Sequence, residues 1–306
     1  MSRFAWSTVC VLVAVGLILA LVENVSYQAC LLAGLGACYV ALLAAGSLVP
    51  RLDFYLHAVR RGPADHPWVA LTFDDGPNPA TTPLLLELLQ RERIPAAFFF
   101  VGGAARRYPD LVARAAADGH LIGNHSDRHG YGWAVSSAEQ IFAEFAAASR
   151  TLAGILGQPP RFVRTPAGVS SPHLADALQR LQLRNVAWDV RGLEGVYRDP
   201  ERIAAWVARR GRNGSIILLH ELYYGVCHFK PGQVLATAQL TIERLRSRGF
   251  HFVRLDRLLE QPDHAAVSSD RNTSLETGAL LVEKGAGQAM GYCDVATIAS
   301  RAGRAG

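Results

Sequence analysis

Two long apolar stretches near the start of the chain predict a pair of membrane-spanning helices. They cover roughly Ala5–Val22 and Ala29–Val49; neither contains a charged residue, and the connection between them carries only Glu23. Each is long enough to cross a hydrocarbon core of about 30 Å as a helix. A signal peptide fits less well, because no small-x-small cleavage site follows the first stretch. A pair of buried core helices would rarely go this long without charge. We therefore expect residues 1–50 to form a helical hairpin that anchors the chain in a membrane.

Farther along, short apolar runs alternate with helical patterns. The runs are Trp68–Phe73, Ala96–Val101, His120–Gly123, Phe162–Arg164, Val186–Trp188, Ser215–Leu219 and Phe250–Arg254. Strands that alternate with helices predict an α/β domain with a mainly parallel sheet or barrel. Seven runs favour a distorted, incomplete (β/α) barrel over a regular eightfold one, with the chemistry at the carboxyl ends of the strands.

Helix signals stand between these runs and set the domain limits. The starts are Thr82-Pro83, Ser137 with Gln140 as a capping box, and Asp199-Pro200, and a helical period runs from Val234 to Arg248 before Gly249. We assign 67–260 to one catalytic domain and 51–66 to a juxtamembrane linker. Residues 261–306 turn to Ser, Asp, Ala and Gly without a clear period, which predicts a disordered tail.

The charge pattern bears on the location of the domain. The net charge is +5, but the basic residues are scattered and form no aromatic-interleaved stripe, so nucleic-acid binding is not expected. Arg3 precedes the first stretch and Arg51, Arg60 and Arg61 follow the second, whereas the connection has no Lys or Arg. The positive-inside rule then predicts an integral protein of a bacterial inner membrane, with the domain on the cytoplasmic face. If the first stretch is cleaved or only one spans, the domain lies outside.

The five cysteines have no metal or disulfide spacing.

Asp74 and Asp75 follow directly on an apolar run and precede Gly76-Pro77. Two adjacent carboxylates repel each other, and a bound metal relieves this by taking one as a ligand and leaving the other as a base. An acidic turn is the alternative, and Asp-Gly-Pro alone favours it.

His125 and His129 also follow an apolar run. Two histidines four residues apart can meet one metal on a single helical turn, although such a pair alone is usually incidental. Together with an aspartate they form a ligand set for a catalytic divalent ion that keeps open positions. We expect zinc, and cobalt or another first-row ion also suits the set.

Two further segments place polar groups at strand ends. Arg164-Thr165-Pro166-Ala167-Gly168 follows one apolar run, and His220 ends the fully apolar run Ser215–Leu219. A histidine at the rim of a buried strand suits a general acid, and a capped core histidine is the alternative.

The order of these motifs over 67–260 resembles the polysaccharide deacetylases, carbohydrate esterase family 4, and the string Thr72–Pro77 is its strongest signal. The resemblance implies a barrel of that type and hydrolysis of an N-acetyl group on an amino sugar. It also implies the following roles: Asp74 as base, Asp75, His125 and His129 as metal ligands, Arg164 holding Asp74, the main-chain N–H of Ala167 at the oxyanion, Leu218 lining the acetyl pocket, and His220 as acid.

The fourth motif of that family departs here. It often carries an aspartate that tunes the acid histidine and a tryptophan that walls the acetyl pocket. The best alignment places at these positions Arg191, Glu194 and Gly195. A cation near His220 would lower its pKa. Asp189 or Glu194 is left as the partner of this histidine, and Trp188 or Tyr197 as the wall.

Two other functions stay open at this point. A membrane-tethered domain reaches lipid-linked sugars more easily than a wall polymer, which favours a deacetylase or deformylase on a lipid-linked amino sugar. The altered fourth motif favours a non-catalytic, membrane-tethered glycan-binding module, although such a module needs no base. The sequence gives no oligomeric state.

Overall fold

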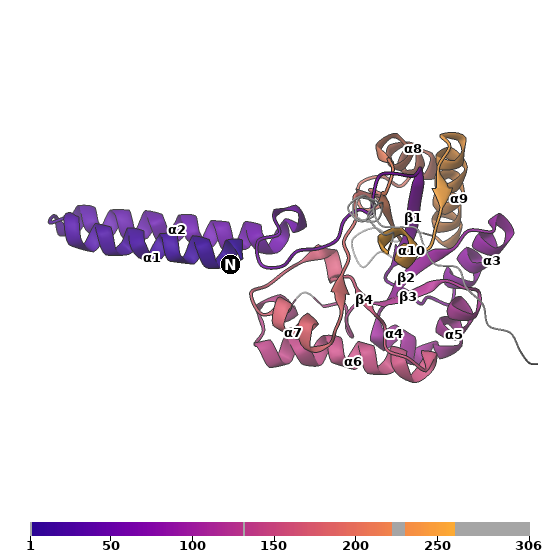
Figure 1. The fold of residues 1–306 in the computed structure, drawn as a ribbon, viewed down its shortest axis with the longest axis horizontal. Coiled ribbons are helices and arrows are strands. Elements are labelled where there is room, and N and C mark those ends of the chain that lie inside the picture. Colours follow the sequence, from indigo (N-terminus) through magenta and orange to yellow (C-terminus); the bar gives the residue numbers. More distant parts are fainter. Residues whose placement is uncertain (1, 131, 222–229, 261–306) are drawn as a thin grey trace, which may run out of the picture. The chain divides into compact units, whose positions relative to one another are not determined.

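The computed structural model describes residues 2–130, 132–221 and 230–260. It begins with two long helices, α1 (Arg3–Leu21) and α2 (Val25–Leu48), which lie side by side (Figure 1). The side chains of Ser2 and Asn24 cap them, which satisfies backbone N–H groups that a helix start leaves unpaired. Large apolar side chains such as Leu21 and Val25 are more than 70% exposed. The two predicted helices are therefore present, and their length and composition suit a membrane anchor or a signal sequence.

The domain is built on a parallel sheet. Its strands are β1 (Trp68–Asp74), β2 (Ala96–Phe100), β3 (Leu121–Asn124), β4 (Phe162–Val163), β5 (Arg184–Asn185), β6 (Val190–Arg191), β7 (Ile216–His220) and β8 (His251–Phe252). The strand order is β5-β4-β3-β2-β1-β7-β6, and β8 pairs with the start of β1. All these pairs are parallel, and the sheet curls into a half-barrel. The predicted incomplete barrel is confirmed.

One predicted strand is wrong. Every apolar run contains a strand except Val186–Trp188, where the chain passes between β5 and β6. Val186 makes only a single bridge, to Val59. The buried guanidinium of Arg164 donates to the carbonyl oxygens of Val186 (3.2 Å) and Ala187 (3.0 Å). These carbonyls are therefore engaged by a side chain that the apolar pattern does not reveal.

Helices connect the strands and cover the sheet (Figure 1). They are α3 (Thr82–Glu92), α4 (Gly102–Arg107), α5 (Pro109–Ala117), α6 (Ala138–Leu156), α7 (Leu174–Arg180), α8 (Pro200–Arg210), α9 (Pro231–Ser247) and α10 (Leu255–Leu259), with short 3-10 turns η1 (Pro50–Leu52), η2 (Gly132–Val135) and η3 (Pro166–Gly168). The three predicted helix starts are confirmed, including the reciprocal capping box of Ser137 and Gln140. The last long helix starts at Pro231, ahead of the predicted Val234.

Burial of β1 on both faces explains its apolar run. Val69, Leu71 and Phe73 point into the main core, and Ala70 joins a second cluster on the opposite face. Successive side chains of a strand alternate between faces, so Asp74 lies opposite to Phe73. Fully burying one such large side chain contributes about 1.5–3 kcal/mol, which fixes the register of the strand that delivers the aspartates.

The segment between α2 and β1 also contacts the domain. Phe54, Tyr55 and Ala58 are buried, and Arg61 makes an antiparallel bridge to Ser215. The assignment of 51–66 as a linker and of 67–260 as the domain stays a prediction. The predicted disordered tail, 261–306, lies outside the described residues.

Candidate metal centre and active site

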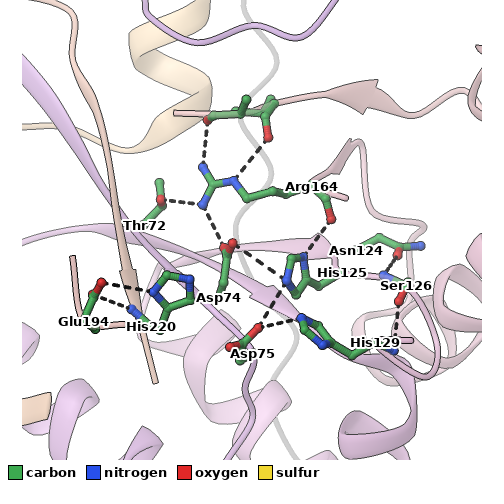
Figure 2. Close-up of polar contacts among 12 residues, drawn as sticks. Thr72, Asp74, Asp75, Asn124, His125, Ser126, His129, Arg164, Glu194 and His220 are labelled. Atoms are coloured by element: carbon green, nitrogen blue, oxygen red, sulfur yellow. Dashed lines mark hydrogen bonds and ion pairs between the residues drawn. The ribbon is translucent and has the colours of Figure 1, made fainter. Parts of the chain in front are cut away.

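The register of the sheet brings the predicted residues to one edge. Asp74 at the end of β1 stands opposite His220 at the end of β7. On the other side, Asn124 ends β3 beside Phe100 of β2, and its carbonyl accepts a hydrogen bond from the Arg164 amide (2.9 Å). Parallel strands end at the same edge, so the residues that follow them converge (Figure 2).

Asp75, His125 and His129 form a buried trio. Oδ1 of Asp75 lies 2.9 Å from Nε2 of His129 and 3.3 Å from Nε2 of His125. One ligand atom from each residue lies within 4.8 Å of the other two. Nδ1 of His125 lies 2.7 Å from the carbonyl of Arg164, and because a carbonyl only accepts, this nitrogen carries the proton. In the neutral ring Nε2 then keeps its lone pair, so the donor set suits a divalent cation.

The trio is electrostatically coupled. Burial alone raises the pKa of Asp75, but hydrogen bonds from His125 and His129 outweigh it and hold the pKa below its usual range. Burial lowers the pKa of His125, and the nearby carboxylates of Asp74 and Asp75 reverse this to a net rise. In this structure, positive charge on the histidines would balance the buried carboxylates. A bound cation would supply that positive charge instead.

The two histidines lie on a loop, so the predicted single helical turn is wrong. Ser126 and His129 have left-handed backbones, with φ of 62° and 56°. The Asn124 side chain accepts from the Ser126 amide (2.8 Å), and the Ser126 hydroxyl accepts from the His129 amide (3.1 Å). These side-chain bonds replace the helical pattern and turn His129 back toward Asp75. Glu144 of α6 accepts from the amides of Asp127 (3.1 Å) and Arg128 (2.7 Å), which fixes the loop.

Arg164 holds Asp74 as the resemblance implied. Its Nη1 donates to Oδ1 of Asp74 (2.8 Å) and to the hydroxyl of Thr72 (2.7 Å), and the whole side chain is buried. Oδ2 of Asp74 faces the trio and lies 3.8 Å from Nε2 of His125 (Figure 2). One carboxylate oxygen is therefore engaged by arginine and the other points to the candidate metal centre.

Of the two carboxylates left open as partners of His220, the structure selects Glu194. Its Oε2 lies 3.4 Å from Nδ1 of His220, and its Oε1 accepts from the His220 amide (3.2 Å). Asp189 instead pairs with Arg212 (2.9 Å). Burial lowers the pKa of His220, but Glu194, with help from Asp75 and Asp74, raises it to about 9. The expected lowering by a nearby cation is therefore wrong in its net direction.

The remaining predicted residues lie around the same edge. Ala167 is exposed in η3 with a left-handed backbone (φ 52°). Leu218 is buried and shares a face of β7 with His220, because the two are separated by one residue. Trp188 lies against Gly168, at which a β-carbon would come 3.0 Å from the indole, whereas Tyr197 packs against the main core.

Glu221 is a buried acid that the sequence reasoning missed. It follows His220, and it accepts a hydrogen bond from the hydroxyl of Thr82 at the start of α3. Burial raises its pKa to about 8, with a smaller contribution from Asp75. A β-carbon at Gly76 would collide with this carboxyl group, so a larger residue there would force the carboxyl group to shift where the aspartate turn passes over it. The adjacency to His220 and the turn residues Gly76-Pro77 were the available signals.

Comparisons with known proteins place this geometry in a family. The family model described as polysaccharide deacetylase matches residues 61–186. A chitooligosaccharide deacetylase of Bradyrhizobium sp. is 36% identical over 55% of this chain and 78% of its own. The peptidoglycan-N-acetylglucosamine deacetylase PgdA of Listeria monocytogenes is 28% identical over 62% of this chain, which spans only 38% of that relative.

Solved structures agree on the fold. The peptidoglycan deacetylase PdaC from Bacillus subtilis is 28% identical, with a TM-score of 0.56 over 64% of this chain and 91% of that one. A CE4 family pseudoenzyme from Bacillus anthracis, 20% identical, shares the fold at a TM-score of 0.60 over 66% and 69% of the two chains. The fold alone therefore does not establish turnover. The chain belongs to the polysaccharide deacetylase family.

Proposed function

We propose that this protein is a metal-dependent N-deacetylase that acts on an N-acetylated amino-sugar glycan. The observation that carries the proposal is the buried trio of Asp75, His125 and His129 beside Asp74, whose free oxygen faces it. Relatives described as chitooligosaccharide and peptidoglycan deacetylases support the substrate class.

Asp75, His125 and His129 would hold the ion. A divalent ion bound there supplies a water of lowered pKa and polarises the amide carbonyl. The Arg164 carbonyl keeps the proton of His125 on Nδ1, so Nε2 faces the ion without a change of tautomer. Zinc is the proposed ion, and the same ligands suit cobalt.

Asp74 is the proposed base. Arg164 holds one of its carboxylate oxygens at 2.8 Å and leaves the other toward the trio, where it can take the proton of the attacking water. The guanidinium is anchored by four hydrogen bonds, to Thr72, Asp74, Val186 and Ala187. The base is therefore oriented before substrate binds.

His220 is the proposed acid on the other side of Asp74 (Figure 2). Glu194 keeps its imidazole protonated at neutral pH, so it can give a proton to the departing amine. The main-chain N–H of Ala167 is proposed to hold the oxyanion, and Leu218 to line the acetyl pocket.

Acetate release tests the proposal. The full chain, purified in detergent, is incubated with chitin oligomers and peptidoglycan in the presence of zinc, cobalt or a chelator. We expect release with metal and its loss with chelator. Asp74→Asn should keep stoichiometric metal and lower the rate by about 10²–10⁴-fold, the usual contribution of a general base. Release from metal-free protein would reject the assignment. Stoichiometric metal without release from any substrate would favour the glycan-binding module instead.

The helices α1 and α2 are proposed to anchor the domain at the cytoplasmic face of a bacterial inner membrane. The support is their apolar composition and the arginines that flank them. Labelling of a cysteine introduced at exposed Glu87, by a reagent that does not cross membranes, tests the orientation. Labelling in intact spheroplasts would place the domain outside.

A further inference from the structure

A cavity of about 410 Å³ lies between the end of α2 and the domain. Its walls come from the residues after α2, from the crossing between β5 and β6, and from α8. The charged and aromatic side chains that line it are Arg51, Arg60, Trp188, Asp189, Arg191, Trp206 and Arg210. The proposed mechanism leaves these side chains without a role.

The cavity carries an excess of positive charge. Two lining groups are neutralised within the fold, since Arg60 pairs with Asp53 (2.6 Å) and Asp189 with Arg212 (2.9 Å). Among the described residues, no carboxylate lies within ion-pair distance of the other lining cations, Arg51, Arg191 and Arg210. Nε of Arg191 is buried and has no hydrogen-bond partner among the residues that the structure describes.

Two of these arginines lie over aromatic rings. The Arg210 guanidinium lies 3.3 Å from the centre of the Trp206 ring, and that of Arg191 lies 5.8 Å from the Trp188 ring. Guanidinium groups that stack on rings keep their N–H edges free, and those edges match the oxygens of a phosphate. An anion in the cavity would accept hydrogen bonds from these N–H groups and balance the positive charge of the arginines.

Residues that line the cavity neighbour both the candidate active site and the end of an apolar helix. Arg191 pairs in register with Leu218, two residues before His220. Trp188 lies against Gly168, next to the proposed oxyanion residue. On the other side the lining continues into Leu48 and Val49, at the carboxyl end of α2.

We propose that this cavity binds the phosphate of a lipid-linked N-acetylamino sugar, with the lipid chain beside α2 and the sugar at the candidate metal centre. The inference rests on the proposed N-deacetylation and specifies its substrate. It also accounts for the departure in the fourth motif. Glu194 serves His220, which leaves position 191 for an arginine that faces the phosphate.

A matched pair of substrates tests the proposal. One is a synthetic N-acetylglucosaminyl phosphate carrying a single alkyl chain, and the other is the neutral alkyl glycoside with the same sugar and chain length. Deacetylation by the zinc-loaded full chain in neutral detergent gives a kcat/KM for each. We expect the phosphate substrate to be preferred at low salt, and the preference to shrink as salt is added.

Variants of the cavity arginines test whether the preference for the phosphate substrate arises in the cavity. Arg191→Gln and Arg51→Gln should each lower the ratio of the two kcat/KM values by about tenfold, the usual loss for one charge-assisted hydrogen bond. The control is Arg209→Gln, a neighbour of Arg210 that does not line the cavity, and it should leave the ratio unchanged. Equal kcat/KM values in the wild type, or a ratio that no cavity variant changes, would overturn the proposal while leaving N-deacetylation intact.

Direct binding separates failure of this inference from failure of the proposed function. Titration of the Asp74→Asn protein with the phosphate substrate and the neutral glycoside measures affinity without turnover. Tighter binding of the phosphate form, weakened by Arg191→Gln, supports the site even if acetate release fails. Equal binding of soluble N-acetylglucosamine 1-phosphate without the chain would show a phosphate site that does not select lipids, and vesicles of plain anionic phospholipid that compete fully would show a general headgroup site. Either result would overturn the lipid-linked substrate.

Discussion

The two halves of the candidate site are built by different rules. In the metal half, Asp75, His125 and His129 lie within the two short sequence strings that predicted them. In the acid half, His220 was predicted, but its partner Glu194 comes from the loop after β6, where the resemblance fails. Metal ligands must converge to bond lengths of about 2 Å, whereas a carboxylate 3–4 Å away is enough to keep a histidine protonated. The comparison teaches that the sequence predicts a residue's role best when that role requires an exact position, whatever the chemical importance of the residue.

Loss of one imidazole from the trio should have the largest effect. In His129→Ala the trio loses one imidazole, and we expect the bound metal to be lost and kcat/KM to fall by about 10³-fold or more, since a catalytic ion contributes several kcal/mol. Metal content by mass spectrometry of the purified protein and acetate release check this. The control is His173→Ala, which removes an exposed histidine that is not part of the trio. Full metal content with normal activity in His129→Ala would show that this histidine does not bind the metal.

A change in the acid half should act mainly on the pH dependence. The pKa of His220 is about 9, above its ordinary value of 6.5, so the protonated acid persists until the pH rises through that value. Glu194→Gln removes the carboxylate that raises this pKa, and burial then pulls it down. We expect the alkaline limb of the kcat/KM profile to move to lower pH, with metal content unchanged.

The pH dependence of the loss in kcat/KM shows whether Glu194 sets the pKa of His220. At pH 8 the loss should be about tenfold and should shrink as the pH is lowered, because more of the acid is then protonated. The matched control is Glu87→Gln, an exposed carboxylate on α3. An alkaline limb that stays in place in Glu194→Gln would show that this carboxylate does not tune His220.

The smallest effect should come from Glu221, which neither half uses directly. Its folded pKa is about 8 and its ordinary value is 4.5, so the stability that it contributes is complete below pH 4.5 and is lost as the pH rises through 8. In Glu221→Gln this loss is absent, because the amide does not ionise and its oxygen can still accept from Thr82. The fall in Tm between pH 5 and pH 8, measured with chelator present, should shrink by on the order of 5 °C. An unchanged fall would show that Glu221 stays neutral or is solvated over this range.

Local patterns predicted much of the fold for physical reasons that act over few residues. The apolar run of β1, the capping box at Ser137, and proline at the starts of α3 and α8 each depend on neighbours within one turn or strand. The run Val186–Trp188 failed because its carbonyls bond to Arg164, a residue 22 positions away for Val186. A long-range polar contact of this kind leaves no local period.

The sequence by itself determined the two apolar helices, the parallel α/β plan and the residues able to hold a metal, because composition and spacing act within short segments. Only the tertiary structure decided that His129 turns back on a loop, that Glu194 and not Asp189 serves His220, and that Glu221 is buried under Gly76. Each of these depends on which strand lies beside which, and a contact between distant segments is chosen by the packing of the whole sheet.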